Sequence, residues 1–184
     1  MQIKNKIILI FICLFVCSSN IQAKELNISA NEITIDKKNN ILIGKGSVIV
    51  TDAEGKIITA DKVTYEKSKE FLLVEGSVKV VDIQGNIMIA DRVSYDKIKN
   101  IIIATNNSEL TLKEGYNLKS NKILYYTIKK IISSDQNSIF TDIDGNIVTV
   151  NMFQYYVEKN LFSSVGKIKV IDLDKNKYFF KELH

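Results

Sequence analysis

The chain has 184 residues, of which 46% are hydrophobic and 25% charged, enough to build one globular domain. Its formal net charge is only +4, and lysines and acids alternate without clustering, which argues against a nucleic acid as partner. Both cysteines, Cys13 and Cys17, lie near the N-terminus. The remaining sequence therefore has no disulfide and no cysteine-based metal site.

Residues 1–23 have the pattern of a secretory signal peptide. Lys4 and Lys6 precede an apolar run from Ile7 to Cys17, and a short polar stretch follows the run. This pattern predicts cleavage between Ala23 and Lys24 and export of a domain spanning residues 24–184. The apolar run is too short to span a bilayer comfortably, which disfavours a retained anchor.

From residue 27 onward the sequence repeats every 30 residues for about five units, without insertion. One phase of the repeat carries a small or apolar residue followed by Asp or Asn, a second carries an aromatic, and two others carry glycine. These phases are Ala30-Asn31, Ala60-Asp61, Ala90-Asp91, Ser120-Asn121 and Val150-Asn151; Tyr65, Tyr95, Tyr125 and Tyr155; Gly46, Gly76 and Gly166; and Gly55, Gly85, Gly115 and Gly145. Such a register predicts one supersecondary unit stacked on copies of itself.

The first strand of a unit changes phase near its middle. Ile58 and Ala60 alternate with polar neighbours, whereas Val63 and Tyr65 alternate on the opposite parity. A strand cannot change its buried face without a bulge or a sharp bend. We therefore expect a corner at Asp61-Lys62 and at the matching position of every unit.

The second strand of a unit is expected to bend at its glycine. Phe71 and Leu73 alternate before Gly76, and Val78 and Val80 alternate after it on the opposite parity. Glycine tolerates the backbone angles that a kink requires. This pattern predicts that the buried face changes at Gly76 as well.

Two bent strands per unit predict an all-β antiparallel meander folded along its length into two facing leaves. The expected turns are rich in Lys or Gly and fall at 67–69, 97–100, 53–55, 83–85 and 143–146. About ten strands spaced ~4.8 Å apart would form a trough roughly 50 Å long, lined by apolar side chains.

The sequence offers little for catalysis. Its only histidine is His184, at the last position, so no histidine-based dyad is expected within the domain. Asp61 and Asp91 recur at the predicted corner, which favours a structural role at a turn. Asp142–Asn146 lacks the glycine and glutamate positions of a calcium loop. We therefore predict a protein that is not an enzyme, with no catalytic residues, no metal and no cofactor.

The segment Ile58–Tyr65, followed by Val74–Val80, resembles the OstA-like β-jellyroll of lipopolysaccharide transport. The pattern recurs at Ile89–Tyr95 and at Ile28–Ile35, and the resemblance covers residues 27–184. The family includes the periplasmic bridge protein LptA, the inner-membrane protein LptC and the N-terminal domain of the outer-membrane protein LptD. The fold that the resemblance implies is the OstA-like β-jellyroll of stacked, bent strands.

The C-terminal segment decides our choice within the family. Lys177–His184 is similar to a segment of LptD jellyrolls, and Phe180-Lys181 occupies the Ala-Asp position of a sixth unit. We therefore expect a fragment from the N-terminal part of LptD. A free-standing LptA-type bridge is the alternative. A parallel β-helix, as an adhesin or a carbohydrate-active enzyme, and a structural repeat protein with a sealed core also remain open.

The resemblance implies shielding of lipopolysaccharide acyl chains in an apolar periplasmic groove next to the outer membrane. The implied partners are lipopolysaccharide, neighbouring LptA-type jellyrolls joined by edge-strand pairing and, for LptD, the lipoprotein LptE. The residues expected to line the groove are Ile33, Ile35, Val48, Val50, Val63, Tyr65, Phe71, Leu73, Val78, Val80, Val93 and Tyr95.

Overall fold

The computed structural model describes residues 26–183, and these form a single antiparallel sheet of 14 strands. The predicted signal peptide, its cleavage site between Ala23 and Lys24, and His184 lie outside the described residues. Within residues 26–183, no helix is long and apolar enough to cross a membrane. All strand pairs are antiparallel, which confirms the predicted meander and excludes the parallel β-helix.

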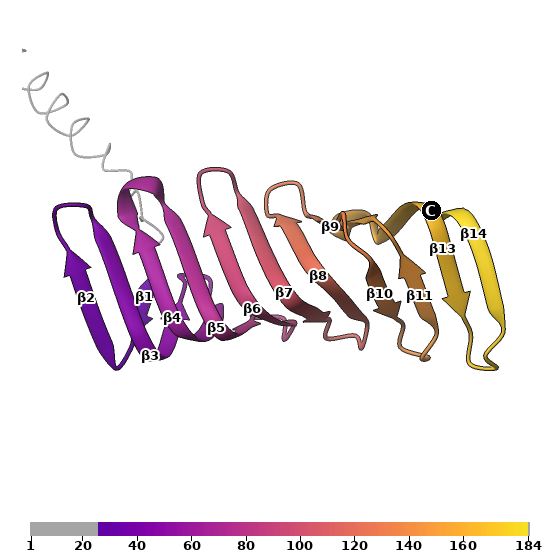
Figure 1. Cartoon of the computed structure of the whole chain (residues 1–184), viewed down its shortest axis with the longest axis horizontal. Coiled ribbons are helices and arrows are strands. Elements are labelled where there is room, and N and C mark those ends of the chain that lie inside the picture. The colour runs from indigo at the N-terminus through magenta and orange to yellow at the C-terminus, as the bar shows by residue number, and fades with distance from the viewer. Residues whose placement is uncertain (1–25, 184) are drawn as a thin grey trace, which may run out of the picture.

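The strands lie side by side along the long axis of the molecule (Figure 1). They are β1 (Asn27–Ser29), β2 (Glu32–Asp36), β3 (Ile41–Thr51), β4 (Ile57–Glu66), β5 (Phe71–Val81), β6 (Ile87–Asp96), β7 (Ile101–Thr111), β8 (Asn117–Tyr126), β9 (Ile131–Ser134), β10 (Ser138–Thr141), β11 (Ile147–Val150), β12 (Phe153–Tyr156), β13 (Leu161–Ile171) and β14 (Lys177–Leu183), with short 3₁₀ turns η1 (Lys67–Lys69) and η2 (Val157–Lys159). In each of three pairs, β1–β2, β9–β10 and β11–β12, the two strands are the halves of one bent strand. The 14 strands therefore correspond to eleven bent ones.

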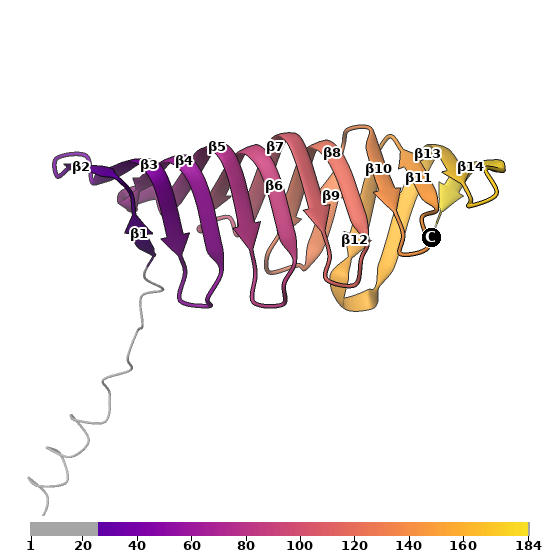
Figure 2. The ribbon, with the colours of Figure 1, turned by 90° about the horizontal axis from the view of Figure 1, so that it is seen from below.

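The predicted corner at Asp61 is a β-bulge. Lys45 pairs with Lys62 and Val48 with Ala60, so Gly46-Ser47 of β3 faces Asp61 alone. Gly46 and Ser47 have positive φ angles of 73° and 47°. A bulge bends its strand and strengthens the local twist, and equivalent register shifts recur from β3 to β8 and at β13–β14. The sheet is thereby folded into two layers (Figure 2).

The predicted change of face at Gly76 is wrong. Leu72, Val74 and Val78 are all buried on one face of β5, so Phe71 and Leu73 lie on the outer face. The reason is the length of the bulge. Gly76 and Ser77, both with positive φ, form a two-residue insertion, and two residues leave the period-2 alternation of a strand unchanged. The single corner residue of β4 inverts that alternation, as predicted.

Two leaves result from the corners. Leaf A runs from the corners to the turns at 37–40, 67–70, 97–100, 127–130 and 157–160, and leaf B runs to the turns at 52–56, 82–86, 112–116, 142–146 and 172–176. The leaf B turns contain the predicted glycines, and Gly55, Gly85, Gly115 and Gly145 have φ angles between 84° and 99°. In most of these turns an Asp side chain caps the backbone; for example, the Asp142 carboxylate accepts the N–H groups of Asp144 and Asn146 at 3.0 and 2.8 Å.

Candidate functional site: an apolar trough

The inner faces of the two leaves carry four rows of side chains. In each leaf, a deep row lies next to the corner and a mouth row lies next to the turns. The deep rows are Gly44, Val63, Val74, Val93, Ala104, Ile123, Ser134, Phe153 and Ser164 in leaf A, and Val48, Ala60, Val78, Ala90, Ser108, Ser120, Ser138, Val150 and Ile168 in leaf B. The mouth rows are Leu42, Tyr65, Leu72, Tyr95, Ile102, Tyr125, Ile132, Tyr155 and Phe162 in leaf A, and Val50, Ile58, Val80, Met88, Leu110, Leu118, Phe140, Val148 and Val170 in leaf B.

The deep rows form a packed core. Their buried apolar members, each at most 7% exposed, belong to one cluster that includes side chains of both leaves. Four mouth-row residues, Val50, Leu72, Leu110 and Leu118, are buried in the same cluster. Gly44 allows a close approach, because a Cβ there would lie 2.9 Å from Cγ1 of Val63 and 3.0 Å from Cβ of Ala30. The leaves therefore contact each other next to the corner, and an accessible apolar surface is found only farther toward the turns.

The half-buried members of the mouth rows provide that surface. Tyr65, Tyr95, Val80 and Met88 are half-buried and pack against the core cluster. Burial, and then the charge of Glu70, raises the pKa of the Tyr65 hydroxyl, so this side chain is neutral at pH 7. A mouth-row tyrosine thus offers an apolar ring with a neutral polar end.

One hydroxyl group of the tyrosine ladder, that of Tyr155, reaches a leaf A turn. The Tyr155 hydroxyl donates a hydrogen bond to Oδ1 of Asn160 at 2.8 Å. Along the ladder, each tyrosine pairs with an aliphatic or aromatic residue of the next strand, as Tyr65 pairs with Leu72 and Tyr155 with Phe162. Cross-strand packing is therefore the structural role of these rings.

The inner rows become exposed at both ends of the sheet. Ile33 and Ile35 lie in β2 and are 47% and 61% exposed, because the opposite leaf has only the three residues of β1 there. At the other end, Tyr178 and Phe180 of the edge strand β14 are each 45% exposed. The apolar surface therefore extends along the full length of the described sheet.

The structure divides the twelve predicted lining residues into four groups. Val48, Val50, Val63, Val78 and Val93 are buried in the packed core; Tyr65, Val80 and Tyr95 are half-buried in the mouth rows; Ile33 and Ile35 lie exposed on the inner face of an edge strand; and Phe71 and Leu73 lie on the outer face. The sequence analysis missed Leu42, Leu72 and Ile102, because they lie in runs such as Ile41–Ile43 that are apolar on both faces and show no alternation.

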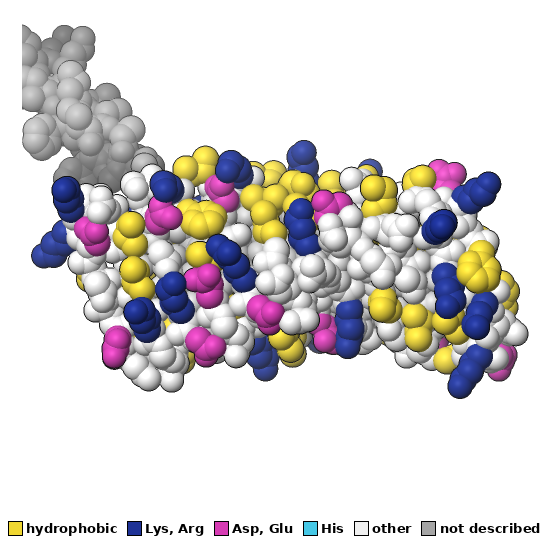
Figure 3. Space-filling view, in the orientation of Figure 1, with side chains coloured by type: hydrophobic (Ala, Val, Ile, Leu, Met, Phe, Trp, Pro, Cys, Tyr) yellow, Lys and Arg dark blue, Asp and Glu magenta, His cyan; other side chains and the backbone are white. Residues whose placement is uncertain are grey.

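The outer surface carries charges of both signs, spread between apolar side chains (Figure 3). Glu75, for example, lies 3.2 Å from Lys62 and 3.9 Å from Arg92 on the strands to either side. Among residues 26–183 there is no group of three or more His, Cys, Asp or Glu side chains that could hold a metal ion. The trough is therefore the candidate site that the described residues offer.

Comparisons with known proteins support the same fold. No protein-family model matches the sequence, and no curated protein is similar to it. Among solved structures, the chain is similar to LptH from Pseudomonas aeruginosa, the LptA homologous periplasmic component of the lipopolysaccharide transport device, with a TM-score of 0.53 and 18% identity over 59% of this chain and 80% of that one. The TCP10 domain of Danio rerio CPAP aligns with a TM-score of only 0.17 and 10% identity, over 85% of this chain and 99% of that one, which supports no inference. The chain therefore has the fold of an LptA-like β-jellyroll.

Proposed function

We propose that this protein is a non-enzymatic carrier of lipopolysaccharide in the periplasm, which shields acyl chains at the mouth rows of the trough. The observation that carries this proposal is the continuity of the mouth rows, whose apolar side chains extend without a charged residue from Leu42 to Phe162 in leaf A and from Val50 to Val170 in leaf B. The fold shared with LptH supports it.

The physics of such a carrier needs no specific contact. Each methylene that leaves water contributes roughly 0.8 kcal/mol, so a few partly shielded acyl chains would be held firmly. Because the mouth rows repeat from unit to unit, neighbouring positions along the trough are nearly equivalent. Lipid would move between them without entering a deep energy minimum, while its sugars remain in solvent.

The edges of the sheet suggest how the carrier joins its neighbours. Among the described residues, β2 and β14 each pair with one strand only, and they expose apolar inner-row residues such as Ile35 and Phe180. Such edges accept a further strand by backbone pairing. We propose LptA-type jellyrolls as neighbours and the N-terminal part of LptD as the parent protein, with LptE as a partner in that case. A free-standing LptA-type bridge is the alternative.

Photocrosslinking in cells tests the proposal with internal controls. A photoreactive amino acid at Val80 or Tyr95, in the mouth rows, should yield lipopolysaccharide adducts. The same group at Leu73, on the outer face of β5, should yield none. Val63, in the deep row, reports whether the leaves separate to admit lipid. Absence of adducts at both mouth positions would contradict the proposal. It would favour a structural protein with a sealed core, an alternative that is consistent with the packed deep rows.

A further inference from the structure

At β7, the deep row of leaf B changes from apolar residues to serines. Three consecutive deep-row positions of leaf B, in β7, β8 and β10, are serines, and Ser134 of leaf A lies opposite them. In the preceding strands the same row contains only valine and alanine. The serines are Ser108, Ser120 and Ser138, which are paired in register, and the apolar positions before them are Val48, Ala60, Val78 and Ala90.

Three of these serines satisfy one another. The Ser120 and Ser134 hydroxyls share a hydrogen bond of 3.0 Å that joins the two leaves, and the Ser138 hydroxyl lies 3.0 Å from that of Ser120. The backbone N–H of Gln136 donates to Oγ of Ser134 at 3.0 Å. A buried hydrogen-bonded network of this kind is stable without any ligand.

Ser108 is different. Its side chain is buried, with the residue only 2% exposed, yet Oγ has no hydrogen-bond partner among the described residues. A buried hydroxyl without a partner costs about 1–3 kcal/mol. Ser108 belongs to the row that contains Ser120, and its hydroxyl can both donate and accept a hydrogen bond. It is therefore the member of the cluster that can accept a further partner.

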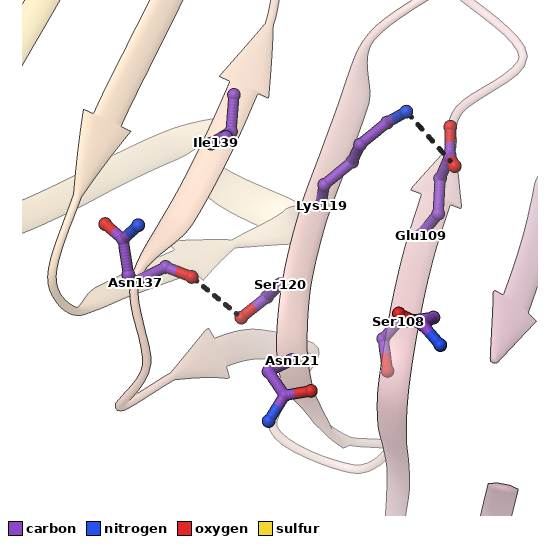
Figure 4. A pocket seen from close by; sticks show the side chains of 8 residues that line it. Ser108, Glu109, Lys119, Ser120, Asn121, Asn137 and Ile139 are labelled. Atoms are coloured by element: carbon purple, nitrogen blue, oxygen red, sulfur yellow. Dashed lines mark hydrogen bonds and ion pairs between the residues drawn. The ribbon is translucent and has the colours of Figure 1, made fainter. Parts of the chain in front are cut away.

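The sheet is interrupted beside this cluster. The pairing of β8 passes from Ser120–Ser138 directly to Leu124–Ser133, so Asn121 and the two residues after it lack cross-strand partners on that side. A pocket of about 390 Å³ lies beside this gap, lined by Asn107, Ser108, Glu109, Lys119, Ser120, Asn121, Asn137 and Ile139 (Figure 4). It opens on the outer side of leaf B, because Glu109, Lys119 and Ile139 alternate with the inner-row residues. Its two charged groups neutralise each other, because Nζ of Lys119 lies 3.4 Å from a Glu109 carboxylate oxygen.

We propose that the four serines (Ser108, Ser120, Ser134 and Ser138, the serine cluster) form a polar binding site inside the apolar trough, which a neutral hydroxyl group carried on an acyl chain reaches when the leaves separate. This inference rests on the proposed function. A hydroxyl on a chain is unfavourable against apolar side chains unless it finds a partner, and the serine cluster provides one at a single position along the trough. The site thereby selects hydroxylated chains and fixes their position along the axis.

Matched probes and matched variants test the site. The probes are tetradecanoic acid and 3-hydroxytetradecanoic acid, which differ by one hydroxyl group. Their dissociation constants are measured by titration calorimetry on the wild type, Ser108→Ala and Ala60→Ser. The wild type should bind the hydroxylated probe about three- to tenfold more tightly, as expected for one hydrogen bond. Ser108→Ala should lose this preference, whereas Ala60→Ser, in the same row but three strands away from Ser108, should keep it.

The outcomes separate the two proposals. Equal affinity of the wild type for both probes, or an unchanged preference in Ser108→Ala, would overturn the serine site and leave the carrier function standing. A wild type that binds neither probe would overturn both. Because Ser108→Ala removes an unpaired hydroxyl, the variant should fold; its thermal unfolding provides the control, and Ser138→Ala provides a second variant of the cluster.

Discussion

The N-terminal strands β3–β6 and the C-terminal strands β7–β13 share one repeat but fill their interior differently. In β3–β6 the deep rows contain valine, alanine and one glycine, and the buried residues are all apolar. In β7–β13 the interior contains serines together with three phenylalanines. The rings of Phe140 and Phe153 lie 4.7 Å apart, and those of Phe140 and Phe162 lie 4.5 Å apart, both edge to face.

This difference shows how little of the interior the repeat dictates. Both regions fold into the same two leaves, and the space between these leaves is filled either by many small aliphatic side chains or by a few large rings beside small polar ones. Small, uniform side chains give equivalent positions along the trough. The C-terminal region instead contains distinct positions, one aromatic and one polar, and any ligand would meet them in order.

The largest expected effect lies in the aromatic cluster. Phe153→Ala removes a buried ring in contact with Phe140 and Phe162, and should lower the free energy of unfolding by about 3–5 kcal/mol, measured by urea denaturation. Phe179→Ala is the control, because Phe179 is 73% exposed on the outer face of β14. Equal losses in the two variants would mean that the rings do not hold the C-terminal leaves together.

The corrected face of β5 gives the next largest effect, in the N-terminal region. Leu72→Ala, in the core, should cost about 2–5 kcal/mol of unfolding free energy. Leu73→Ala, one residue away on the outer face, should cost clearly less. If denaturant titrations showed a larger loss for Leu73→Ala than for Leu72→Ala, the buried face of β5 would change at Gly76, as the sequence suggested.

The corner itself is tested at Gly76. This residue has a φ of 78°, and a Cβ there would lie 2.8 Å from Cβ of Asp61 and closer still to the Asp61 carboxylate. Gly76→Ala should therefore destabilise the fold by about 2–3 kcal/mol. Gly85→Ala, at a φ of 91° with no atom within 4 Å, should cost only the backbone strain, about 1 kcal/mol. The difference between their thermal midpoints isolates the steric contribution of the corner.

The serine cluster should respond to substitution in two directions. Ser108→Ala removes a buried hydroxyl without a partner and should raise the free energy of unfolding by about 1 kcal/mol. Ser138→Ala removes a hydroxyl that lies 2.9 Å from the Gln136 carbonyl and should lower that free energy by a similar amount. Destabilisation by both changes would show that the Ser108 hydroxyl has a hydrogen-bond partner, as the neighbouring serines have.

The smallest expected effect depends on pH. Burial works to raise the pKa of Asp142, but hydrogen bonds from the Asn146 side chain and from nearby backbone N–H groups outweigh it and lower that pKa. The folded state thus favours the charged form of Asp142. The charged carboxylate contributes to the free energy of unfolding above the pKa of Asp142 in the unfolded chain, and this contribution is lost as pH falls through the lower pKa of the folded state. Between pH 6 and pH 3, Asp142→Asn should lose less thermal stability than the wild type.

The sequence was sufficient for those features that depend on local backbone chemistry. The glycine turns, the corner at Asp61 and the two-leaf meander were predicted because each requires particular residues at a fixed spacing. The orientation of Phe71–Val74 was not, because this run is apolar on both faces and a two-residue bulge leaves parity unchanged. The serine cluster was also missed: Ser120 was interpreted as a small residue at the corner, and nothing local indicated that Ser134 would meet it from the other leaf.

The alternation of one-residue and two-residue corners has a consequence for how the molecule can change in length. From β3 to β8, each strand with a single corner residue pairs with neighbours that have two, so a strand added or lost alone there would leave like corners face to face. The sheet can therefore be lengthened or shortened only by whole 30-residue units. Each unit adds two strand spacings, or about 10 Å. Duplication or deletion of one such unit in the gene would therefore change the length of the sheet while preserving the alternation of corners at the join.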